Sequence, residues 1–290
     1  MKSSHSQFTT VRGLRYHLRS WGEPTAPRLF MLHGWMDVSA SFQFLVDALK
    51  QDWYVLAPDW RGYGLTEWTP QGYWIPDYLG DLDALLTQYS PEAPARLVGH
   101  SLGGNIACLY AGVRPQRVSH VVSLDAFGLP RTDPAEAPGR YRRWLDELAD
   151  APAFAPYASL DAVAARLKKS NPRLTDDKAR FLAAHWAEVL PDGSARLRSD
   201  PAHKLVYPVL YRLEESLACW RAVTAQVLLV EAEDATIRKW IAEHPDDFAA
   251  RKTAFANLRE HTVNDAGHML HHDQPQALAA VIEEFLDVSA

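Results

Sequence analysis

The sequence is poor in cysteine, with only Cys108 and Cys219 among 290 residues. Two cysteines exclude a disulfide framework, and neither belongs to a C-x-x-C pair of the kind found in redox or metal motifs. Cys108 lies in an apolar stretch, so we expect it to be a buried free thiol.

Long apolar runs are also absent. No run approaches the roughly 18 residues that a membrane-spanning helix needs. The first residues, MKSSHSQFTTVRG, lack the apolar core of a signal peptide. A formal net charge of −6 gives no electrostatic reason to expect nucleic acid or an anionic membrane as a partner. We therefore expect a cytoplasmic protein that does not insert into membranes.

Short apolar segments alternate with amphipathic ones over the first 128 residues. Residues 8–22 show period-two apolar positions around an Arg-Gly turn, which predicts a β-hairpin. Several apolar runs end in polar residues or glycine, as strands buried on both faces do. Segments with helical spacing separate them, and this alternation predicts a mostly parallel, twisted sheet flanked by helices. The strand candidates are residues 28–34, 53–59, 96–101 and 118–125.

The pattern changes after Gly128. Residues 129–222 hold many prolines and charged amphipathic segments but no strand pattern. Residues 225–234 then resume the sheet, a last strand follows near residue 258, and a closing helix follows it. We expect an α/β core from residues 1–128 and 223–290, with residues 129–222 forming a helical cap between the sixth and seventh strands.

One short motif carries the chemistry. Gly99-His100-Ser101-Leu102-Gly103 matches G-x-S-x-G between an apolar strand and an apolar helix. That context needs glycines because the strand-to-helix turn is very tight and lifts the serine hydroxyl above the sheet. At the helix N-terminus, backbone N–H groups favour developing negative charge. Ser101 is therefore the predicted nucleophile.

An oxyanion needs two N–H donors. One is expected from Leu102, directly after the nucleophile. The second is expected from Trp35, in the loop after residues 28–32, where Gly34 allows close approach of the backbone; Met36 lies nearby. For His33 we expect a hydrogen bond that orients this loop rather than a catalytic role.

The general base is expected from a histidine late in the chain. His268 follows Ala-Gly at the end of the last strand, in a loop that can reach Ser101. His271 and His272 fall where the closing helix begins. A zinc site built from these three histidines lacks an H-E-x-x-H motif and a nearby cysteine ligand, so we expect no metal.

A carboxylate must orient the histidine and stabilise its protonated form. Asp234, or Glu233 beside it, ends the strand after the cap and gives the chain order Ser…Asp…His. Asp125 ends the strand before the cap and could reach the same histidine. No glycine precedes Asp234 in the usual G-x-x-D manner. We favour Asp234 and keep Asp125 as the alternative.

These residues together resemble the α/β-hydrolase fold superfamily. Four motifs occur in that family's order: HGW, PDWRGYGLT, VGHSLGGN and AGHMLHHDQP. The cap segment is similar to the serum hydrolase-like branch. Related dehalogenases and epoxide hydrolases use an aspartate at the nucleophile position, so a serine there implies acyl transfer.

The resemblance implies a serine hydrolase that cleaves carboxylic esters of small to medium apolar substrates, with no cofactor. A carbon-carbon bond hydrolase or a thioesterase would use the same triad, and perhydrolysis would be a side reaction of the same site. A non-catalytic ligand-binding protein on this fold is the alternative from another class. We expect a monomer or homodimer, with the substrate between core and cap. The aromatic residues expected near it are Trp35, Trp60, Tyr63, Trp68 and Trp74.

Overall fold

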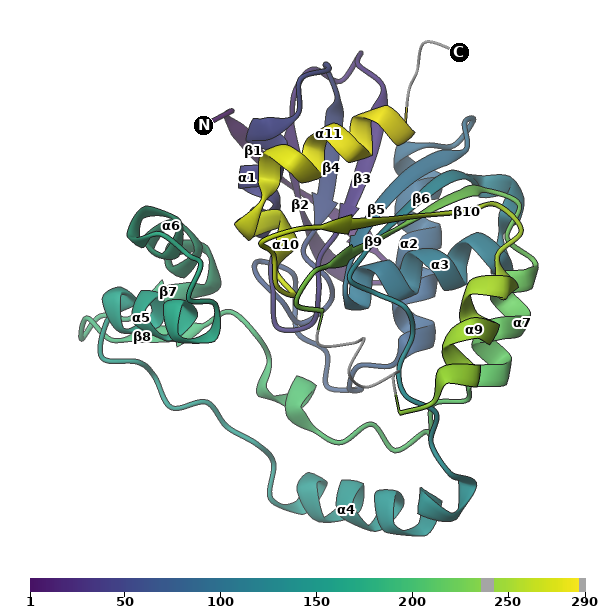
Figure 1. Ribbon diagram of the computed structural model, residues 1–290. Helices are drawn as coiled ribbons and strands as arrows, with labels where there is room; N and C mark the ends of the chain where they lie inside the picture. Colours follow the sequence, from purple (N-terminus) through teal and green to yellow (C-terminus); the bar gives the residue numbers. More distant parts are fainter. Residues whose placement is uncertain (236–242, 287–290) are drawn as a thin grey trace.

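A single eight-stranded sheet runs through the computed structural model, which describes residues 1–235 and 243–286 (Figure 1). The strand order is β1-β2-β4-β3-β5-β6-β9-β10. β1 and β2 form the expected antiparallel hairpin, β2 pairs antiparallel with β4, and all other neighbours are parallel. The strands are β1 (Ser4–Val11), β2 (Leu14–Trp21), β3 (Arg28–Leu32), β4 (Tyr54–Pro58), β5 (Ala95–His100), β6 (Val118–Leu124), β9 (Gln226–Ala232) and β10 (Leu258–Val263).

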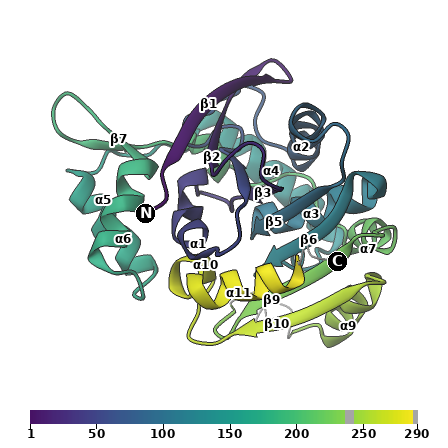
Figure 2. The same cartoon turned by 90° about the horizontal axis from the view of Figure 1, so that it is seen from above.

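Helices cover both faces of the sheet, which confirms the α/β architecture (Figure 2). This explains the continuous apolar runs in the central strands, since parallel strands buried on both faces need apolar residues at every position. One face packs against α2 (Ile75–Tyr89), α3 (Leu102–Val113), α7 (Leu213–Arg221) and α9 (Pro245–Ala254). The other packs against η1 (Ser39–Phe42), α1 (Gln43–Ala48), α10 (Leu270–Asp273) and α11 (Pro275–Phe285). A short turn, η2 (Pro115–Arg117), leads into β6.

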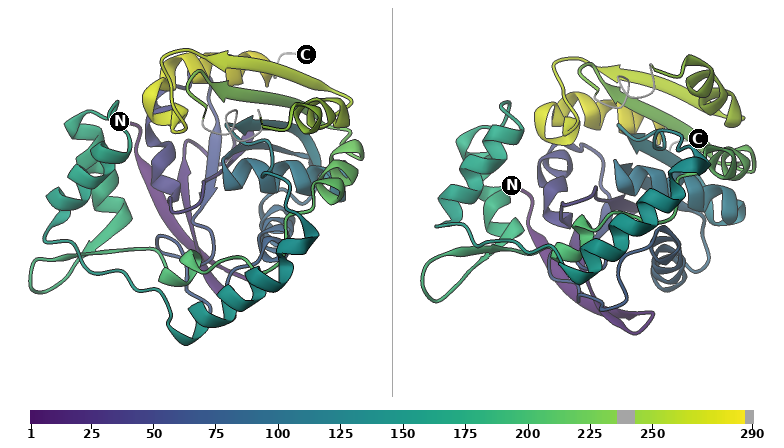
Figure 3. Two further views of the ribbon diagram at one scale, coloured as in Figure 1. Left: turned by 60° about the horizontal axis from the view of Figure 1, so that its bottom comes forward. Right: turned by 90° about the horizontal axis from the view of Figure 1, so that it is seen from below.

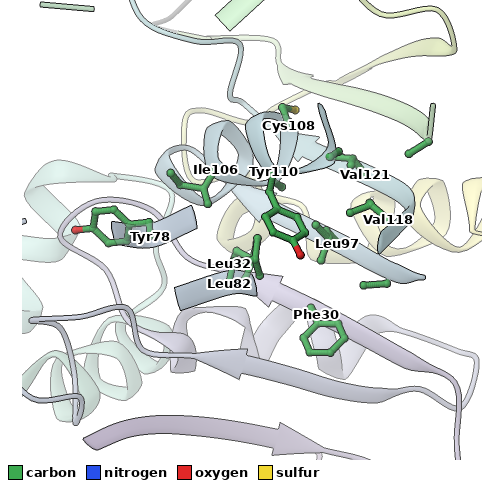
Figure 4. Packing of buried hydrophobic residues seen from close by; sticks show 14 of the residues in the cluster. Phe30, Leu32, Tyr78, Leu82, Leu97, Ile106, Cys108, Tyr110, Val118 and Val121 are labelled. Carbon is green, nitrogen blue, oxygen red and sulfur yellow. The ribbon is translucent and has the colours of Figure 1, made fainter. Parts of the chain in front are cut away.

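The helix that follows the G-x-S-x-G motif is held firmly in place. Ile106 and Tyr110 of α3 share a buried cluster with Leu97 of β5 and Leu82 of α2 (Figure 4). Cys108 is buried in the same cluster, and burial raises the pKa of its thiol to about 12. The thiol is therefore protonated and unreactive, as expected. These contacts pack the middle of α3 against β5 and α2.

Most of the segment between β6 and β9 lies outside the sheet and its covering helices, where we expected the cap (Figure 3). α5 and α6 build a small core of their own around Leu167 and Leu182, and Phe44 from α1 joins it. Ser159 and Thr175 cap the two helices by accepting hydrogen bonds from backbone N–H groups. The cap elements are η3 (Pro134–Glu136), α4 (Ala137–Ala149), α5 (Leu160–Ser170), α6 (Asp176–Trp186), β7 (Ala187–Val189), β8 (Ala195–Leu197) and η4 (Pro201–Lys204).

The cap also contains a feature that we did not predict. We expected no strand in residues 129–222, but β7 and β8 form an antiparallel hairpin. Each strand has three residues, which is too short to show a period-two pattern in the sequence.

Within the described residues, no helix combines the length and the apolar character needed to cross a bilayer.

The last helix before β9, α7 (Leu213–Arg221), packs with the core. α7 was placed in the cap, yet Leu213, Leu217 and Trp220 are buried in the core cluster. α7 also lies close to α3, because a Cβ added to Gly112 would lie 1.9 Å from the carbonyl oxygen of Cys219. The charged, amphipathic pattern of this helix is typical of cap segments, but its apolar stripe faces the core.

This close approach can be tested with a pair of glycine substitutions. Gly112→Ala should lower the free energy of unfolding by about 1–3 kcal/mol, since α7 would have to move away from α3. Gly139→Ala on α4 is the matched control, because a Cβ there meets nothing within 4 Å. We expect the control to be neutral or to stabilise by about 0.5–1 kcal/mol. Urea unfolding followed by circular dichroism measures both; equal stability of the two variants would contradict the α3–α7 packing.

Candidate active site

The turn between β5 and α3 holds Ser101 in a strained backbone conformation. Its φ is 51° and its ψ is −113°. Such a conformation costs about 1–3 kcal/mol and persists only where the surrounding structure enforces it. A Cβ at Gly99 would lie 2.4 Å from the carbonyl of Gly103, and a Cβ at Gly103 would lie 2.0 Å from the carbonyl oxygen of Leu32. Glycine is therefore required on both sides of the serine, which stands directly before the N-terminus of α3.

The loop after β3 packs against this turn. A Cβ added to Gly34 would lie only 3.2 Å from the Cβ of Ser101. Trp35 follows Gly34, and Met36 has a φ of 56°. Leu102 is the first residue of α3, where backbone N–H groups have no partner within the helix. Both expected oxyanion donors, Trp35 and Leu102, thus belong to segments at Ser101, and their role as donors stays a prediction.

His33 fixes the same loop, as we expected. Its Nδ1 lies 2.8 Å from the carbonyl oxygen of Gly34, and its Nε2 accepts a hydrogen bond of 2.8 Å from the backbone N–H of Trp60. The Trp60 indole returns a hydrogen bond of 3.0 Å to the carbonyl oxygen of His33. Burial lowers the pKa of His33 to about 4, so the ring is neutral at pH 7. His33 therefore ties the loop to the end of β4.

His268 is paired with Asp125. Its Nδ1 lies 2.6 Å from Oδ2 of Asp125, the residue that directly follows β6. Asp125 is fully buried, whereas 42% of the His268 side chain is exposed. A backbone hydrogen bond of 2.8 Å from the N–H of Asp125 to the carbonyl oxygen of Val230 fixes the carboxylate at the carboxyl edge of the sheet. The geometry fits a carboxylate that accepts the Nδ1 proton of a histidine.

The structure does not bring Asp234, which we favoured, to His268. The Asp234 side chain is 62% exposed and forms an ion pair with Arg173 of the cap. Glu233 accepts a hydrogen bond of 2.9 Å from the backbone N–H of Asp265. Both carboxylates lie past the end of β9 and have other partners. The preference for Asp234 on chain order is therefore corrected in favour of the alternative, Asp125.

The D-x-R-G-x-G stretch, residues 59–64, makes buried contacts that hold loops together. Asp59 accepts hydrogen bonds from the backbone N–H groups of Ser39 and Leu65, at 2.7 and 2.9 Å. Arg61 makes a bidentate ion pair with Asp81 of α2, at 2.7 and 2.6 Å. These buried contacts lock together the loops that follow β3 and β4.

We did not predict a buried polar cluster that lies next to the turn holding Ser101. The Nε2 of His100 donates a hydrogen bond of 2.7 Å to the backbone carbonyl of His268. The ring of His100 lies 4.5 Å from that of His271, centroid to centroid, and Asp37 lies beside His271 with 4.0 Å between Oδ2 and Nε2. Burial lowers the pKa of both His100 and His271 well below the ordinary value and raises that of Asp37 to about 7. These residues come from three separate segments, so no sequence spacing reveals them.

His272 and His271, the other two histidines late in the chain, contact Ser41. His272 Nε2 lies 2.6 Å from the hydroxyl of Ser41, and His271 Nε2 lies 3.2 Å from the same hydroxyl. Burial lowers the pKa of His272 to about 3. His271 and His272 therefore share Ser41 as a partner, whereas His268 is paired with Asp125.

Aromatic residues link the core to the cap. Trp74, just before α2, lies against Trp144 of α4 and Tyr207, with ring centroids 6.3 and 5.4 Å apart. Trp35 donates a hydrogen bond of 3.2 Å from its indole to the carbonyl oxygen of His203. Of the other aromatic residues expected near the substrate, two are buried in the core and one is exposed: Trp60, Tyr63 and Trp68.

Known proteins resemble the chain over most of its length. The family described as alpha/beta hydrolase fold matches residues 27–275. A serine hydrolase-like protein of Danio rerio is 28% identical over 92% of this chain and 83% of its own length. The 2-(acetamidomethylene)succinate hydrolase of Mesorhizobium japonicum is 26% identical over 91% of this chain and 89% of its own length.

A solved structure shows the same fold. The thioesterase domain from the curacin biosynthetic pathway superposes with a TM-score of 0.84 at 23% identity, covering 97% of this chain and 99% of that domain. The family match, the strand order and the strained serine turn agree with one another. The chain belongs to the α/β-hydrolase fold family, among relatives named serine hydrolase-like proteins.

Proposed function

We propose that the protein hydrolyses carboxylic esters of small to medium apolar substrates through an acyl-enzyme on Ser101. The observation that carries this proposal is the 2.6 Å contact between His268 and the buried Asp125, in a protein whose Ser101 stands on a strained turn before a helix N-terminus. A nucleophile, a base and a carboxylate that orients the base are the parts that acyl transfer requires.

In the first half-reaction, the Ser101 hydroxyl attacks the ester carbonyl carbon and its proton passes to Nε2 of His268. The hydrogen bond to Asp125 fixes the other proton on Nδ1, which leaves the lone pair of Nε2 free to act as the base. The N–H groups of Trp35 and Leu102 stabilise the oxyanion. The intermediate then collapses, the ester C–O bond breaks, and the alcohol leaves with the proton from His268.

In the second half-reaction, water attacks the acyl-enzyme. His268 removes one proton from the water, and the new oxyanion uses the same two N–H groups. Collapse breaks the bond to Ser101, whose oxygen regains the proton from His268, and the carboxylic acid leaves. This chemistry needs no cofactor.

The contacts between core and cap support the substrate class. Trp74, Trp144 and Tyr207 present aromatic surface where the cap meets the core, and binding sites for apolar ligands are lined mainly by such side chains. Thioesters and activated carbon-carbon bonds would use the same triad. Parallel assays with an ester, its matching thioester and a dienol ketone separate these substrates by kcat/KM.

Ser101→Ala should abolish turnover. Removal of the nucleophile from such a triad costs on the order of 10⁶ in kcat. We expect wild-type protein to hydrolyse p-nitrophenyl butyrate and to be labelled by a fluorophosphonate probe, while the variant does neither and keeps its circular dichroism spectrum. Turnover that survives in the variant would remove Ser101 from the mechanism. A wild-type protein that neither reacts with the probe nor hydrolyses esters would support the ligand-binding alternative.

The carboxylate is tested with two matched substitutions. Asp125→Asn keeps the size of the side chain but allows the wrong histidine tautomer, so kcat should fall by about 10⁴. Asp234→Asn removes one charge from an exposed ion pair and should change kcat less than about threefold. Steady-state kinetics on p-nitrophenyl butyrate compares the two. A large loss in Asp234→Asn with an active Asp125→Asn would reverse the assignment.

A further inference from the structure

Three buried side chains next to the serine turn bring potential metal-ligand atoms close to one another. Asp37, His100 and His271 each offer one atom, and these atoms all lie within 4.8 Å of one another. None of the three residues is more than 2% exposed. They come from the loop after β3, the end of β5 and the start of α10, so the fold itself assembles the cluster.

The hydrogen bonding of His100 leaves one lone pair free. His100 donates its Nε2 proton to the carbonyl of His268, which leaves Nδ1 deprotonated, and this buried nitrogen has no hydrogen-bond partner in the described structure. Metal-binding histidines are commonly oriented in this way, with the second ring nitrogen donating to a backbone carbonyl.

Of the two carboxylate oxygens of Asp37, Oδ1 has hydrogen-bond donors and Oδ2 has none among the described residues. Oδ1 of Asp37 accepts hydrogen bonds from the backbone N–H of Val38 and the indole of Trp186, at 2.9 and 3.1 Å. Oδ2 is buried without a hydrogen-bond partner among the described residues and faces Nε2 of His271 at 4.0 Å. A buried carboxylate oxygen without a donor is costly, and a bound cation would offset that cost.

We propose that Asp37, His100 and His271 form a binding site for a divalent transition-metal ion such as Zn²⁺, and that occupancy of this site inhibits the hydrolase. Two imidazoles and one carboxylate form a three-ligand set that suits zinc, with water as the fourth ligand. Mg²⁺ and Ca²⁺ prefer oxygen ligands and are not expected to bind here. Ligands of tetrahedral zinc lie roughly 3.4 Å apart, so atoms that lie within 4.8 Å of one another need to move inward by at most about 1 Å.

The site lies directly behind the catalytic residues. His100 precedes Ser101 in the chain, and its ring lies 4.7 Å from that of His268, centroid to centroid. A cation at this position repels the positive charge that His268 acquires in the transition state. Metal coordination also uses the ring of His100, which donates a hydrogen bond to the backbone carbonyl of His268. Inhibition therefore rests on the proposed function, whereas metal binding itself does not.

This ligand set differs from the three late histidines that the sequence offered. His268 is paired with Asp125, and His272 with Ser41. Only His271 is shared between the two sets. The tertiary structure replaces the other two with Asp37 and His100.

Metal binding is tested first without any activity measurement. Calorimetric titration with ZnCl₂ should give one site per wild-type chain, and Co²⁺ should give the visible absorption of a site with nitrogen ligands. Asp37→Asn and His271→Gln should each weaken zinc binding by at least tenfold. His261→Ala is the control, because it removes an exposed histidine of β10 and should bind like the wild type. Circular dichroism identifies a variant that does not fold, in which case the other ligand variant decides.

Equal zinc affinity in the wild type and a folded ligand variant overturns the site, as does the absence of saturable binding. Inhibition is measured next, as the ratio of fluorophosphonate labelling rates with and without zinc within each protein. Zinc should slow labelling at least tenfold in the wild type and in His261→Ala, but not in Asp37→Asn. Tight zinc binding with unchanged labelling overturns the inhibitory role. Absence of labelling in every protein counts against the proposed hydrolase and leaves the binding result standing.

Discussion

The active site depends on one steric constraint, the contact of the serine turn with the strands beside it. β3, β5 and the start of α3 approach so closely at Gly99 and Gly103 that no side chain fits. The crowding holds the backbone of Ser101 at its positive φ, and the buried cluster under α3 prevents the helix from moving away. The turn can therefore store strain of about 1–3 kcal/mol, because relaxing it would disrupt packing that stabilises the core by much more.

Backbone hydrogen bonds at the end of the sheet also position the carboxylate of Asp125. The N–H of Ser101 donates to the carbonyl of Leu124 at 3.0 Å, and the N–H of the next residue, Asp125, donates to the carbonyl of Val230 at 2.8 Å. Parallel strands end at one edge, so the serine and the aspartate are placed by a continuous hydrogen-bonded ladder. His268 reaches the site from the loop after β10, and Asp125 and His100 hold its ring and its backbone.

Local features of this arrangement could be predicted from sequence, and those that depend on tertiary contacts could not. The strands, the hairpin and the serine turn follow from periodicity and from glycines that a tight turn requires. The choice between Asp125 and Asp234 depends on which strand end the histidine loop overlies, and chain order does not determine that. α7 has the charged pattern of a cap helix but buries Trp220 in the core. Asp37, His100 and His271 meet only once the sheet has formed.

Burial of the cluster of Asp37, His100 and His271 costs free energy, because these polar groups lose their contact with water. Apolar side chains would fill the same space without desolvating a carboxylate and several imidazoles. Two of its contacts extend beyond the core: Trp186 of the cap donates to Asp37, and His100 donates to the backbone carbonyl of His268. The remaining gap is the 4.0 Å between Asp37 and His271, whose ring packs on that of His100. Polar groups at this position thus connect the cap to His268, which a purely apolar filling could not do.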